Sequence, residues 1–426
     1  MCAWMEYIVV NGEKPLKGSV AISGAKNAAV AIIPATIVSG ATCVLDNVPY
    51  IEDVINLTKT LELLGVKCEF RDDNHTLIID ATHVTTHILD EDLAKRNRAS
   101  YYFMGALLAR CGKVVIPIPG GCEIGSRPMG YHLRGFEALG AVCSQEHGIV
   151  TVEAPNGLKG ANVYLDSPSV GATINIMIAA VFAEGTTIIE NSAREPHVVD
   201  TANFLNKLGA RITGAGTNAI RIVGINALAG GEYTIIPDQI EAGTYMIAAA
   251  ISGGDVVVEN IIPKHMESLT AKLKEIGVNI TEGLDSIRVS VDKKLKGCDI
   301  KTSVYPGFPT DLQPQMATLL CTCQTSSVVT ENIFENRYRY VGELRRLGAN
   351  LKLDSRSLII NGNYKLTGAK VEATDLRAGA ALVIAGLVAK GETIISGVEH
   401  LDRGYEQLEE KFTALGADIK RVKTDE

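Results

Sequence analysis

The chain has 426 residues, more than one hydrophobic core usually covers, so two domains are expected. Its formal net charge is −8, and lysine and arginine are dispersed along the sequence, which argues against a nucleic-acid surface because that would need a basic face. No run of about 18 apolar residues predicts a membrane span, and the first ten residues lack the basic start and apolar core of a signal peptide.

The chain repeats one pattern six times. Each copy has the end of an apolar helix, then Leu or Ile, a glycine and Ala or Val, and then a short alternating strand. Successive copies are 75, 69, 68, 71 and 68 residues apart, so the repeat is regular and fills the chain. The glycines of the pattern are Gly65, Gly140, Gly209, Gly277, Gly348 and Gly416.

Each copy also has a second helix, rich in small apolar residues, that leads into a β-branched strand. In most copies this helix ends near a glycine, which suits the left-handed conformation on which helices commonly stop. The fifth copy, around residues 316–334, lacks that glycine. Helices that are apolar on all sides must be buried. We therefore expect an α/β fold in which helices form the interior of each domain and half-buried sheets lie outside them.

A pair of strands joined through an x-Leu-x-Gly segment recurs along the chain; it is present at the N-terminus and missing from the last copy. We infer that residues 6 to about 22 supply the strands missing from the sixth copy, so both chain ends meet in one domain. The first predicted domain is residues 25–236, with three repeats and the Cys122 loop. The second is residues 1–24 with 237–426. Two lobes joined by two connections can close around a ligand.

The nine cysteines, an odd number without paired zinc-type spacing, predict mostly reduced structural thiols and a cytoplasmic location. Cys122 differs, because it lies in PGGCEIGSRPMG, where four glycines and two prolines preclude regular helix or strand. Arg127 and Arg134 come after it, and a nearby cation favours the thiolate. By chemistry alone, an incidental loop cysteine is as good an interpretation as a reactive one.

Several cations stand where the repeats should be apolar or neutral. Lys26 and Asn27 open a helix directly after Ser23-Gly24-Ala25, so backbone N–H groups and a lysine predict an anion site. Four arginines lie at comparable places in different repeats, although each alone is most simply a solvated or salt-bridged side chain. Together they suit a small polyanion with phosphate and carboxylate groups, which arginine binds through paired hydrogen bonds. They are Arg98, Arg337, Arg377 and Arg403.

Carboxylates and backbone donors complete this set. Asp311 lies in PGFPTDLQPQ at a helix start, where an aspartate is often only a cap; among arginines it could instead take a proton from a substrate hydroxyl. Asp375 and Glu195 are weaker candidates for the same role. Backbone donors for a diphosphate are expected ahead of another helix, at Ser169, Val170 and Gly171.

Nine segments, in order and across the whole chain, resemble the UDP-N-acetylglucosamine 1-carboxyvinyltransferases, the enolpyruvyl transferases of bacterial cell-wall synthesis. The segments are SGAKNAA, NRASYY, GGCEIGSRP, SVGATINIM, AREPHVVDTANFL, FPTDLQPQ, FENRY, ATDLRAGAALV and DRGYE. Nine segments in register make a specific match. The resemblance favours a reactive Cys122 over an incidental one.

The resemblance implies a two-domain inside-out α/β barrel of six repeated βαβαββ-like units, three per domain around buried helices, with the active site in the cleft. It implies that the enolpyruvyl group of phosphoenolpyruvate passes to the 3-hydroxyl of UDP-N-acetylglucosamine. A tetrahedral intermediate forms and phosphate leaves, in the first committed step of peptidoglycan precursor synthesis. The implied enzyme is cytoplasmic, needs no metal or organic cofactor, and is a fosfomycin target. Its oligomeric state is left open.

The resemblance also implies a role for each candidate residue. Cys122 matches a loop cysteine that acts as general acid or aids product release and that fosfomycin alkylates. Asp311 matches the residue that orients or deprotonates the attacking hydroxyl. The cations matched to phosphoenolpyruvate are Lys26, Arg98, Arg127 and Arg403, with Arg337 and Arg377 in the same cluster. The positions matched to the sugar and diphosphate are Asn27, Ser169, Val170 and Gly171, and the substrate-binding set is completed by Pro128 and Asp375.

Two positions depart from the family pattern. Gly130 stands where an aspartate usually follows the loop, and Ser167-Pro168 stands where some members place a basic residue. Both bear on affinity for the uridine nucleotide or on the identity of the acceptor. Two alternatives therefore stay open: the sister enzyme 5-enolpyruvylshikimate-3-phosphate synthase, and a regulatory paralogue that binds the sugar nucleotide without turnover. We also expect UDP-N-acetylglucosamine to compact the protein.

Overall fold

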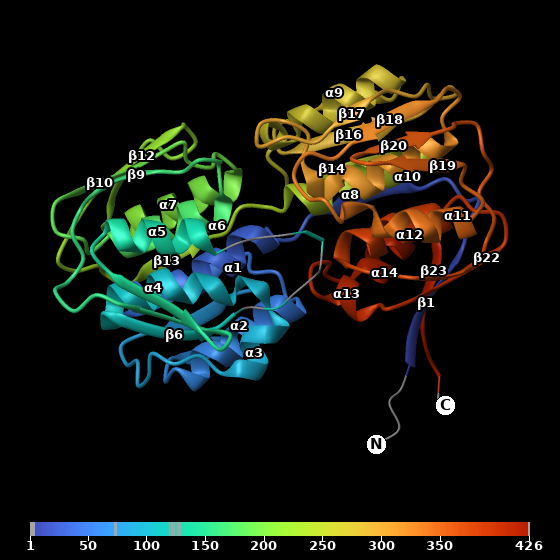
Figure 1. The fold of residues 1–426 in the computed structure, drawn as a ribbon. Coiled ribbons are helices and arrows are strands. Elements are labelled where there is room, and N and C mark those ends of the chain that lie inside the picture. Colours follow the sequence, from blue (N-terminus) through green and yellow to red (C-terminus); the bar gives the residue numbers. More distant parts are fainter. Residues whose placement is uncertain (1–4, 72–74, 119, 121–123, 126–128, 425–426) are drawn as a thin grey trace. The chain divides into compact units, whose positions relative to one another are not determined.

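The computed structural model describes residues 5–71, 75–118, 120, 124–125 and 129–424, and their contacts form two compact units. The middle unit comprises residues 24–71, 75–118, 120 and 129–236. The terminal unit comprises residues 5–23, 124–125 and 237–424, so it holds both ends of the described chain, drawn in dark blue and red in Figure 1. Ile124 and Gly125 thus group with the terminal unit, although they fall inside the predicted 25–236 domain.

Three helices of the middle unit are buried along most of their length, and three more are amphipathic. Within α1, every residue from Ala28 to Ala35 is buried, as expected of a helix that is apolar all round. The buried helices are α1 (Lys26–Ala35), α4 (Tyr102–Cys111) and α6 (Val170–Ala180). The amphipathic helices are α2 (Glu52–Leu63), α5 (Gly130–Ala138) and α7 (Pro196–Lys207), and the short ones are η1 (Thr36–Ser39), α3 (Glu91–Arg96) and η2 (Arg98–Tyr101).

Three sheets of the middle unit have one buried and one more exposed face. Their strand orders are β13-β3-β5-β4, β6-β8-β7 and β11-β12-β10-β9. Alternation places Ile220 and Ile222 of β12 inward, for example, with more exposed residues between them. The strands are β3 (Thr42–Asp46), β4 (Lys67–Phe70), β5 (Leu77–Asp80), β6 (Lys113–Pro117), β7 (Val142–Glu146), β8 (Ile149–Glu153), β9 (Asn162–Tyr164), β10 (Thr186–Glu190), β11 (Arg211–Thr213), β12 (Ala219–Val223) and β13 (Gly231–Thr234).

The terminal unit has the same organisation. Its buried helices are α8 (Gln239–Ile251), α10 (Gln313–Thr322) and α12 (Leu376–Gly386). Its other helices are α9 (Glu267–Ile276), α11 (Val341–Arg346), α13 (Glu399–Asp402), α14 (Leu408–Ala414), η3 (Pro263–Met266), η4 (Thr310–Leu312) and η5 (Arg337–Tyr340). Both units therefore place the most apolar helices of their repeats in the core, as predicted.

The sheets of the terminal unit have the strand orders β21-β22-β1-β23, β15-β16-β14-β2 and β17-β18-β20-β19. The strands are β1 (Met5–Asn11), β2 (Lys17–Ala21), β14 (Asp255–Glu259), β15 (Asn279–Glu282), β16 (Ser286–Ser290), β17 (Ile300–Lys301), β18 (Ser327–Thr330), β19 (Leu351–Asp354), β20 (Ser357–Ile360), β21 (Lys370–Glu372), β22 (Glu392–Ser396) and β23 (Asp418–Thr424).

Neighbouring repeats are interlocked by exchanged strands. Strands β9, β17 and β21 each leave their own repeat and pair in parallel with β10, β18 and β22 of the next one. In the middle unit β13, the last strand, pairs in parallel with β3, the first. Between the first two repeats of the middle unit, the strand exchange is reduced to an isolated bridge between Ile88 and Val115. These exchanges tie neighbouring repeats together, so no single repeat is an independent folding unit.

The two N-terminal strands separate into different sheets. Strand β1 lies between β22 and β23 and completes the sheet of the sixth repeat. Strand β2 instead pairs in parallel with β14. The expectation that both strands complete the sixth copy is therefore wrong for β2. The x-Leu-x-Gly segment carries the chain from one sheet to the next, with Leu16 fully buried at the crossing.

All six glycines of the repeated pattern adopt positive φ, from +90° to +109°. In each case the glycine N–H donates to a carbonyl three residues earlier, and the next N–H donates to a carbonyl five residues earlier. This is the Schellman ending of a helix, which satisfies carbonyls that the helix itself leaves unpaired. No described atom lies within 4 Å of a Cβ built at Gly140 or Gly416, so there the need for glycine is conformational rather than steric.

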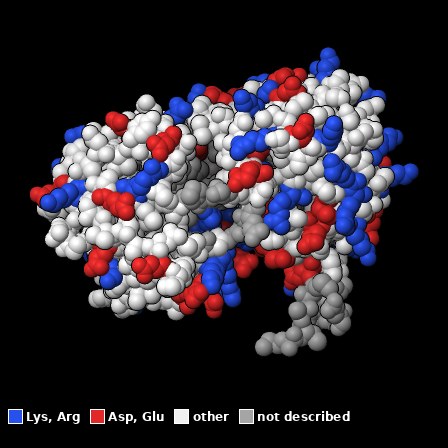
Figure 2. All heavy atoms as spheres, in the orientation of Figure 1, with Lys and Arg blue, Asp and Glu red and all other residues white. Residues whose placement is uncertain are grey.

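Charges are intermixed on the face of the molecule seen in Figure 2, where basic and acidic side chains alternate over short distances. This agrees with the dispersed lysines and arginines of the sequence. Among the helices that the structure describes, none combines the length and the apolar character needed to cross a membrane.

Candidate active site

The start of α1 in the middle unit carries a lysine beside a buried carboxylate. Lys26 is the first residue of α1, and its Nζ lies 2.9 Å from Oδ2 of Asp53, in the first turn of α2. The two side chains are 12% and 4% exposed. A cation at the positive end of a helix is unfavourable unless an anion is close. Asp53 supplies one such charge, and Asn27, half-buried beside Lys26, lies at the same helix start.

Arg98 opens η2, directly ahead of the buried helix α4. The preceding Asn97 is buried; its Oδ1 accepts from the Ala99 N–H at 3.0 Å, and its Nδ2 donates to the Asp53 carbonyl at 2.9 Å. Asp53 therefore contacts Lys26 through its carboxylate and the Arg98 segment through its carbonyl. Lys26 and Arg98, the two predicted cations of the middle unit that the structure describes, therefore come from helix starts joined through Asp53.

A neutral polar cluster lies behind these cations. His132 of α5 is 2.9 Å from Asn175 of α6 through Nδ1 and Nδ2. Asn175 also donates to the Tyr101 carbonyl at 2.9 Å and accepts from the Gly105 N–H at 2.8 Å. Burial, and then the charge of Arg98, lower the pKa of His132 to about 3, so the ring is neutral at physiological pH. The cluster fixes α4, α5 and α6 to one another.

The start of α6 is the third helix start of this group. Ser169 is its N-cap, with Oγ accepting from the Ala172 N–H at 3.4 Å, and Val170 and Gly171 begin its first turn. A Cβ at Gly171 would lie 3.0 Å from the His132 ring, so a larger residue would crowd the neutral cluster. These residues lie at a helix N-terminus as predicted; their binding of a diphosphate stays a prediction.

In the terminal unit, Asp311 lies between two buried arginines. Its Oδ1 is 2.7 Å from Nη2 of Arg337, and its Oδ2 is 3.1 Å from Nη2 of Arg377. Arg337 and Arg377 are 2% and 5% exposed, whereas Asp311 is 26% exposed. Arg337 is held in turn because its Nε donates to the Thr310 carbonyl. The carboxylate is thus oriented by two buried guanidinium groups, and its side chain remains partly exposed.

A ring of hydrogen bonds supports this carboxylate from within the unit. The Tyr405 hydroxyl lies 2.9 Å from Thr244 Oγ1 and accepts from Arg377 Nη1 at 3.4 Å. Gln315 Nε2 donates to the Asp311 carbonyl at 3.0 Å and to Thr244 Oγ1 at 3.3 Å. Burial raises the pKa of Tyr405, so its hydroxyl stays neutral. These contacts tie the starts of α10 and α12 to α8.

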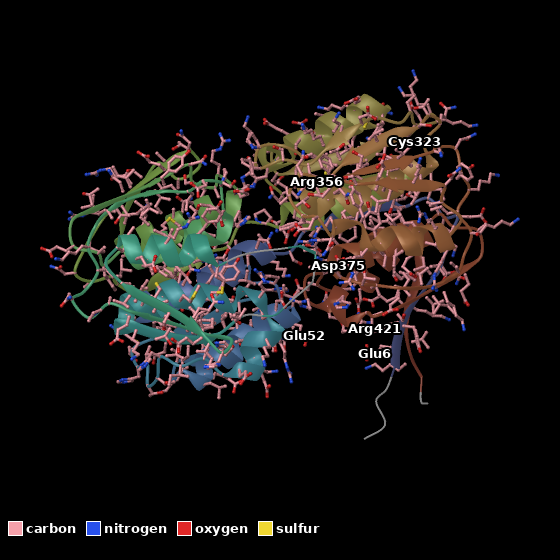
Figure 3. The ribbon with its side chains drawn as sticks, viewed as in Figure 1. Glu6, Glu52, Cys323, Arg356, Asp375 and Arg421 are labelled. Atoms are coloured by element: carbon pink, nitrogen blue, oxygen red, sulfur yellow. The ribbon has the colours of Figure 1, made fainter. Side chains whose placement is uncertain are left out.

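Asp375 and Arg403 are two further predicted residues of the terminal unit. Asp375, labelled in Figure 3, is the N-cap of α12, and its Oδ1 accepts from the N–H groups of Arg377 at 2.9 Å and Ala378 at 3.1 Å. A capping role accounts for this geometry, and substrate binding by Asp375 stays a prediction. Arg403 is half-buried and comes directly after α13.

Three predicted residues, Cys122, Arg127 and Pro128, lie outside the residues that the structure describes. Within the same predicted loop, Ile124 is buried, and its carbonyl accepts from the Asn336 N–H at 3.0 Å. Asn336 immediately precedes Arg337. Glu195, a weaker candidate for a proton acceptor, stands before α7 with Oε2 buried and without a hydrogen-bond partner among the described residues.

Sequence reasoning missed the residues that support the charged ones. Gln315 and Tyr405 lie inside two of the segments that carry the resemblance, FPTDLQPQ and DRGYE, so their position was the available signal. Thr244 is a small polar residue on a buried, mostly apolar helix. Asp53 had the weakest signal, because an aspartate in the first turn of an amphipathic helix usually serves the helix dipole.

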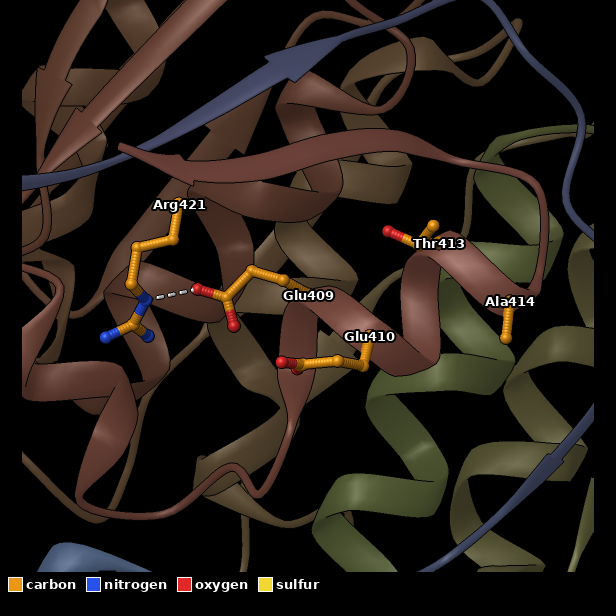
Figure 4. Close-up of a pocket in the computed structure, with 5 residues that line it drawn as sticks. All are labelled: Glu409, Glu410, Thr413, Ala414 and Arg421. Atoms are coloured by element: carbon orange, nitrogen blue, oxygen red, sulfur yellow. Dashed lines mark hydrogen bonds and ion pairs between the residues drawn. The ribbon is translucent and has the colours of Figure 1, made fainter. Parts of the chain in front are cut away.

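The described side chains include no group of three His, Cys, Asp or Glu residues that could hold a metal ion. A surface pocket of about 500 Å³ is present in the terminal unit, lined by Glu409, Glu410, Thr413, Ala414 and Arg421 (Figure 4). None of these five is a predicted site residue.

Comparisons with known proteins show the family to which the chain is similar. Residues 10–412 match the family model of EPSP synthase (3-phosphoshikimate 1-carboxyvinyltransferase). The UDP-N-acetylglucosamine 1-carboxyvinyltransferase 3 of Caldanaerobacter subterraneus is 54% identical over 419 residues, which cover 98% of this chain and 100% of that protein. The UDP-N-acetylglucosamine 1-carboxyvinyltransferase of Clostridium botulinum is also 54% identical, over 420 residues and with the same coverage.

Solved structures give the same fold. The enolpyruvyl transferase NikO from Streptomyces tendae superposes with a TM-score of 0.90 at 25% identity, covering 99% of this chain and 100% of that one. An EPSP synthase from Acinetobacter baumannii superposes with a TM-score of 0.76 at 21% identity, covering 98% and 100%, and this likeness concerns the fold alone.

A mixed α/β fold of the enolpyruvyl transferase type, with arginines grouped around a carboxylate, defines the class of protein. The chain belongs to the EPSP synthase family of 1-carboxyvinyltransferases, and its resemblance to the UDP-N-acetylglucosamine 1-carboxyvinyltransferases is confirmed over nearly its whole length.

Proposed function

We propose that this protein transfers the enolpyruvyl group of phosphoenolpyruvate to the 3-hydroxyl of UDP-N-acetylglucosamine and releases phosphate. The reaction is the first committed step of peptidoglycan precursor synthesis. The observation that carries the proposal is Asp311, a partly exposed carboxylate with a buried arginine on each oxygen, in a chain 54% identical to enzymes named for this activity. Identity to those relatives also favours the sugar nucleotide over shikimate 3-phosphate as acceptor.

The chemistry needs one proton donor and one proton acceptor. In the addition step, a donor protonates the methylene carbon of phosphoenolpyruvate, and the 3-hydroxyl oxygen bonds to the neighbouring carbon as it loses its proton. In the elimination step, a methyl proton leaves and the double bond re-forms. The bond between the neighbouring carbon and the phosphate oxygen breaks, and phosphate departs with that oxygen. Asp311 suits the acceptor role, because two guanidinium groups orient its oxygens and its side chain stays partly exposed, within reach of a substrate hydroxyl.

Fixed cations stabilise the charge that builds on phosphate and carboxylate during this reaction. Lys26 and Arg98 suit this task because each begins a helix, where backbone N–H groups also favour anions. Arg337, Arg377, Arg403 and Arg127 complete the proposed set. Asn27, Ser169, Val170, Gly171, Pro128 and Asp375 are proposed to contact the sugar nucleotide or its surroundings.

Cys122 is proposed as the general acid, or as a group that aids product release, and as the atom that fosfomycin alkylates. The two units are proposed to be the two domains, residues 25–236 and residues 1–24 with 237–426, each an inside-out α/β barrel of three repeats. Both sets of residues must then act on the same substrates, which requires the domains to close. A cytoplasmic location without a metal or organic cofactor fits this reaction.

Phosphate release from phosphoenolpyruvate, with and without UDP-N-acetylglucosamine, tests the proposal. We expect release that depends on the sugar nucleotide, that fosfomycin abolishes in wild type and that fosfomycin leaves intact in Cys122→Asp. Binding of phosphoenolpyruvate with no phosphate release in the presence of this sugar nucleotide would mean that another acceptor is used. Binding of UDP-N-acetylglucosamine without any release would instead favour the regulatory paralogue.

A further inference from the structure

Arg421, on the last strand of the chain, joins three carboxylates from three elements. Its Nη1 and Nη2 donate to the two oxygens of Asp402 at 2.9 and 2.6 Å. Its Nε donates to Glu409 on α14 at 2.7 Å, the pair drawn in Figure 4. Its Nη1 also donates to Glu6 on β1 at 3.1 Å, and Glu6 and Arg421 are labelled close together in Figure 3. One guanidinium thus ties α13, α14 and both terminal strands together.

The paired hydrogen bonds to Asp402 matter because its neighbour in the chain is Arg403. Asp402 is the last residue of α13, a helix of only four residues, and Arg403 is its C-cap. So short a helix has little stability of its own. On its inner side, Leu401 is buried so tightly against α12 that a Cβ at Gly379 would lie 2.9 Å from it. On the other side of α13, the ion pair between Arg421 and Asp402 holds the helix.

The cluster contributes more to geometry than to stability. Arg421 is 27% exposed and Asp402 is 36% exposed, and ion pairs this accessible to water usually add little free energy of unfolding. A planar guanidinium that grips both carboxylate oxygens does, however, set the orientation of its partner. Without Arg421, Asp402 and Glu409 would lose this cation and Glu6 would keep only its pair with Lys423, so repulsion among the carboxylates would loosen the segment.

We propose that Arg421 is a positioning residue for the reaction: it fixes Asp402 and thereby holds the adjacent Arg403 in place for the anionic groups of phosphoenolpyruvate. The inference rests on the proposed function, in which Arg403 contacts that substrate. It also assigns a task to the pairing of the chain ends, since β1 and β23 supply two of the residues in the cluster.

Steady-state kinetics of phosphate release with Arg421→Gln test this inference. We expect kcat/KM for phosphoenolpyruvate to fall about tenfold, because small displacements of a binding group are costly, while KM for UDP-N-acetylglucosamine stays within about twofold. Asp402→Asn should reproduce the split between the two substrates, and the double variant should be no worse than either single one. Arg421→Lys, which keeps the charge but loses the planar fork, should lie in between.

Arg288→Gln is the matched control. Arg288 lies on β16 of the same unit and grips Asp255 through a similar fork, at 2.8 and 2.6 Å, but Asp255 does not adjoin a predicted site residue. The Arg288→Gln variant should leave kcat/KM for phosphoenolpyruvate and KM for UDP-N-acetylglucosamine unchanged. Unaltered kinetics in Arg421→Gln and Asp402→Asn, or an equal loss for both substrates, would overturn the positioning role alone. A wild-type protein without phosphate release would overturn the proposed function, and this inference with it.

Discussion

The two units arrange their candidate residues in opposite senses. In the terminal unit, buried Arg337 and Arg377 hold a more exposed carboxylate, Asp311. In the middle unit, a buried carboxylate, Asp53, holds a more exposed lysine, Lys26. The outward member of each charged group is therefore an anion in one unit and a cation in the other. One unit is suited to accept a proton, and the other is suited to hold an anion.

The supporting contacts differ in the same way. Behind Asp311 a chain of hydrogen bonds includes a charged guanidinium, from Arg377 through the Tyr405 hydroxyl to Thr244. Behind the cations of the middle unit, the support is an imidazole and an amide, His132 and Asn175. The two regions should therefore respond differently to loss of a charge and to acid.

The largest effect is expected from Asp311→Asn, which keeps the size of the side chain but removes its ability to take a proton. Turnover should fall by about 10²–10⁴, the usual contribution of a general base, while phosphoenolpyruvate still binds because the arginines are retained. Phosphate release and calorimetric binding measure the two properties separately. Asp255→Asn, at an exposed ion pair, is the control. Turnover near that of wild type in Asp311→Asn would mean that Asp311 is not the proton acceptor.

The opposite arrangement in the middle unit is tested by Lys26→Met. This change leaves Asp53 buried beside an apolar side chain, so the free energy of unfolding should fall by about 3 kcal/mol. The double variant Lys26→Met/Asp53→Asn should recover most of that stability, because the carboxylate charge is removed together with the lysine, but it should not recover phosphate release. Urea denaturation and the release assay measure these outcomes.

Lys113→Met removes one member of the exposed pair with Glu153 and should cost less than about 1 kcal/mol. If Lys26→Met is as stable as this control, the pair with Asp53 is not structurally important. If the double variant regains activity, Lys26 is not needed for anion binding.

Much of the fold follows from local chemistry and was therefore predictable. The six glycines mark helix ends because each needs a positive φ, and the buried helices show themselves by lacking a polar face. The partner of β2 was not predictable from a strand pattern. Alternation tells which residues of a strand face inward, but it does not tell which sheet the strand joins.

Some residues of the candidate site could be predicted from local sequence signals, and others could not. Lys26, Arg98 and Asp311 stand out because they place charge at the starts of apolar helices. Asp53 and Tyr405 do not, because their importance comes from neighbours far away in the sequence. Tyr405, for example, meets Thr244 and Arg377 only after three helices have packed together. No rule of sequence spacing predicts such contacts.

The pH dependence of the free energy of unfolding tests whether the support in the middle unit is neutral, unlike that behind Asp311. The pKa of His132 is about 3 in the folded protein and near 6.5 in the unfolded chain, so between these values the unfolded chain binds more protons. The stability that the neutral ring contributes is full above pH 6.5 and is lost as the pH falls towards 3. From pH 7 to pH 5, wild type should lose about 2 kcal/mol more than His132→Gln.

Urea denaturation at the two pH values measures this difference. His147→Asn is a suitable control, because His147 is exposed and has a positive φ that asparagine tolerates. Equal pH dependence in wild type and His132→Gln would mean that the ring is not held neutral by its surroundings.

The smallest effect is expected at Gly130, where the sequence departs from the family pattern beside the middle unit's helix starts. Gly130 is the first residue of α5, and nothing in the described part of the chain lies within 4 Å of a Cβ built there. Gly130→Asp should therefore be tolerated and should stabilise the protein by about 0.5–1 kcal/mol, because it places a negative charge at a helix N-terminus and replaces a helical glycine. If the missing aspartate weakens nucleotide binding, KM for UDP-N-acetylglucosamine should fall in Gly130→Asp but not in Gly130→Asn. An equal KM in both variants would show that the carboxylate is not what the acceptor site lacks, and that the middle unit binds its substrate through cations and backbone donors alone.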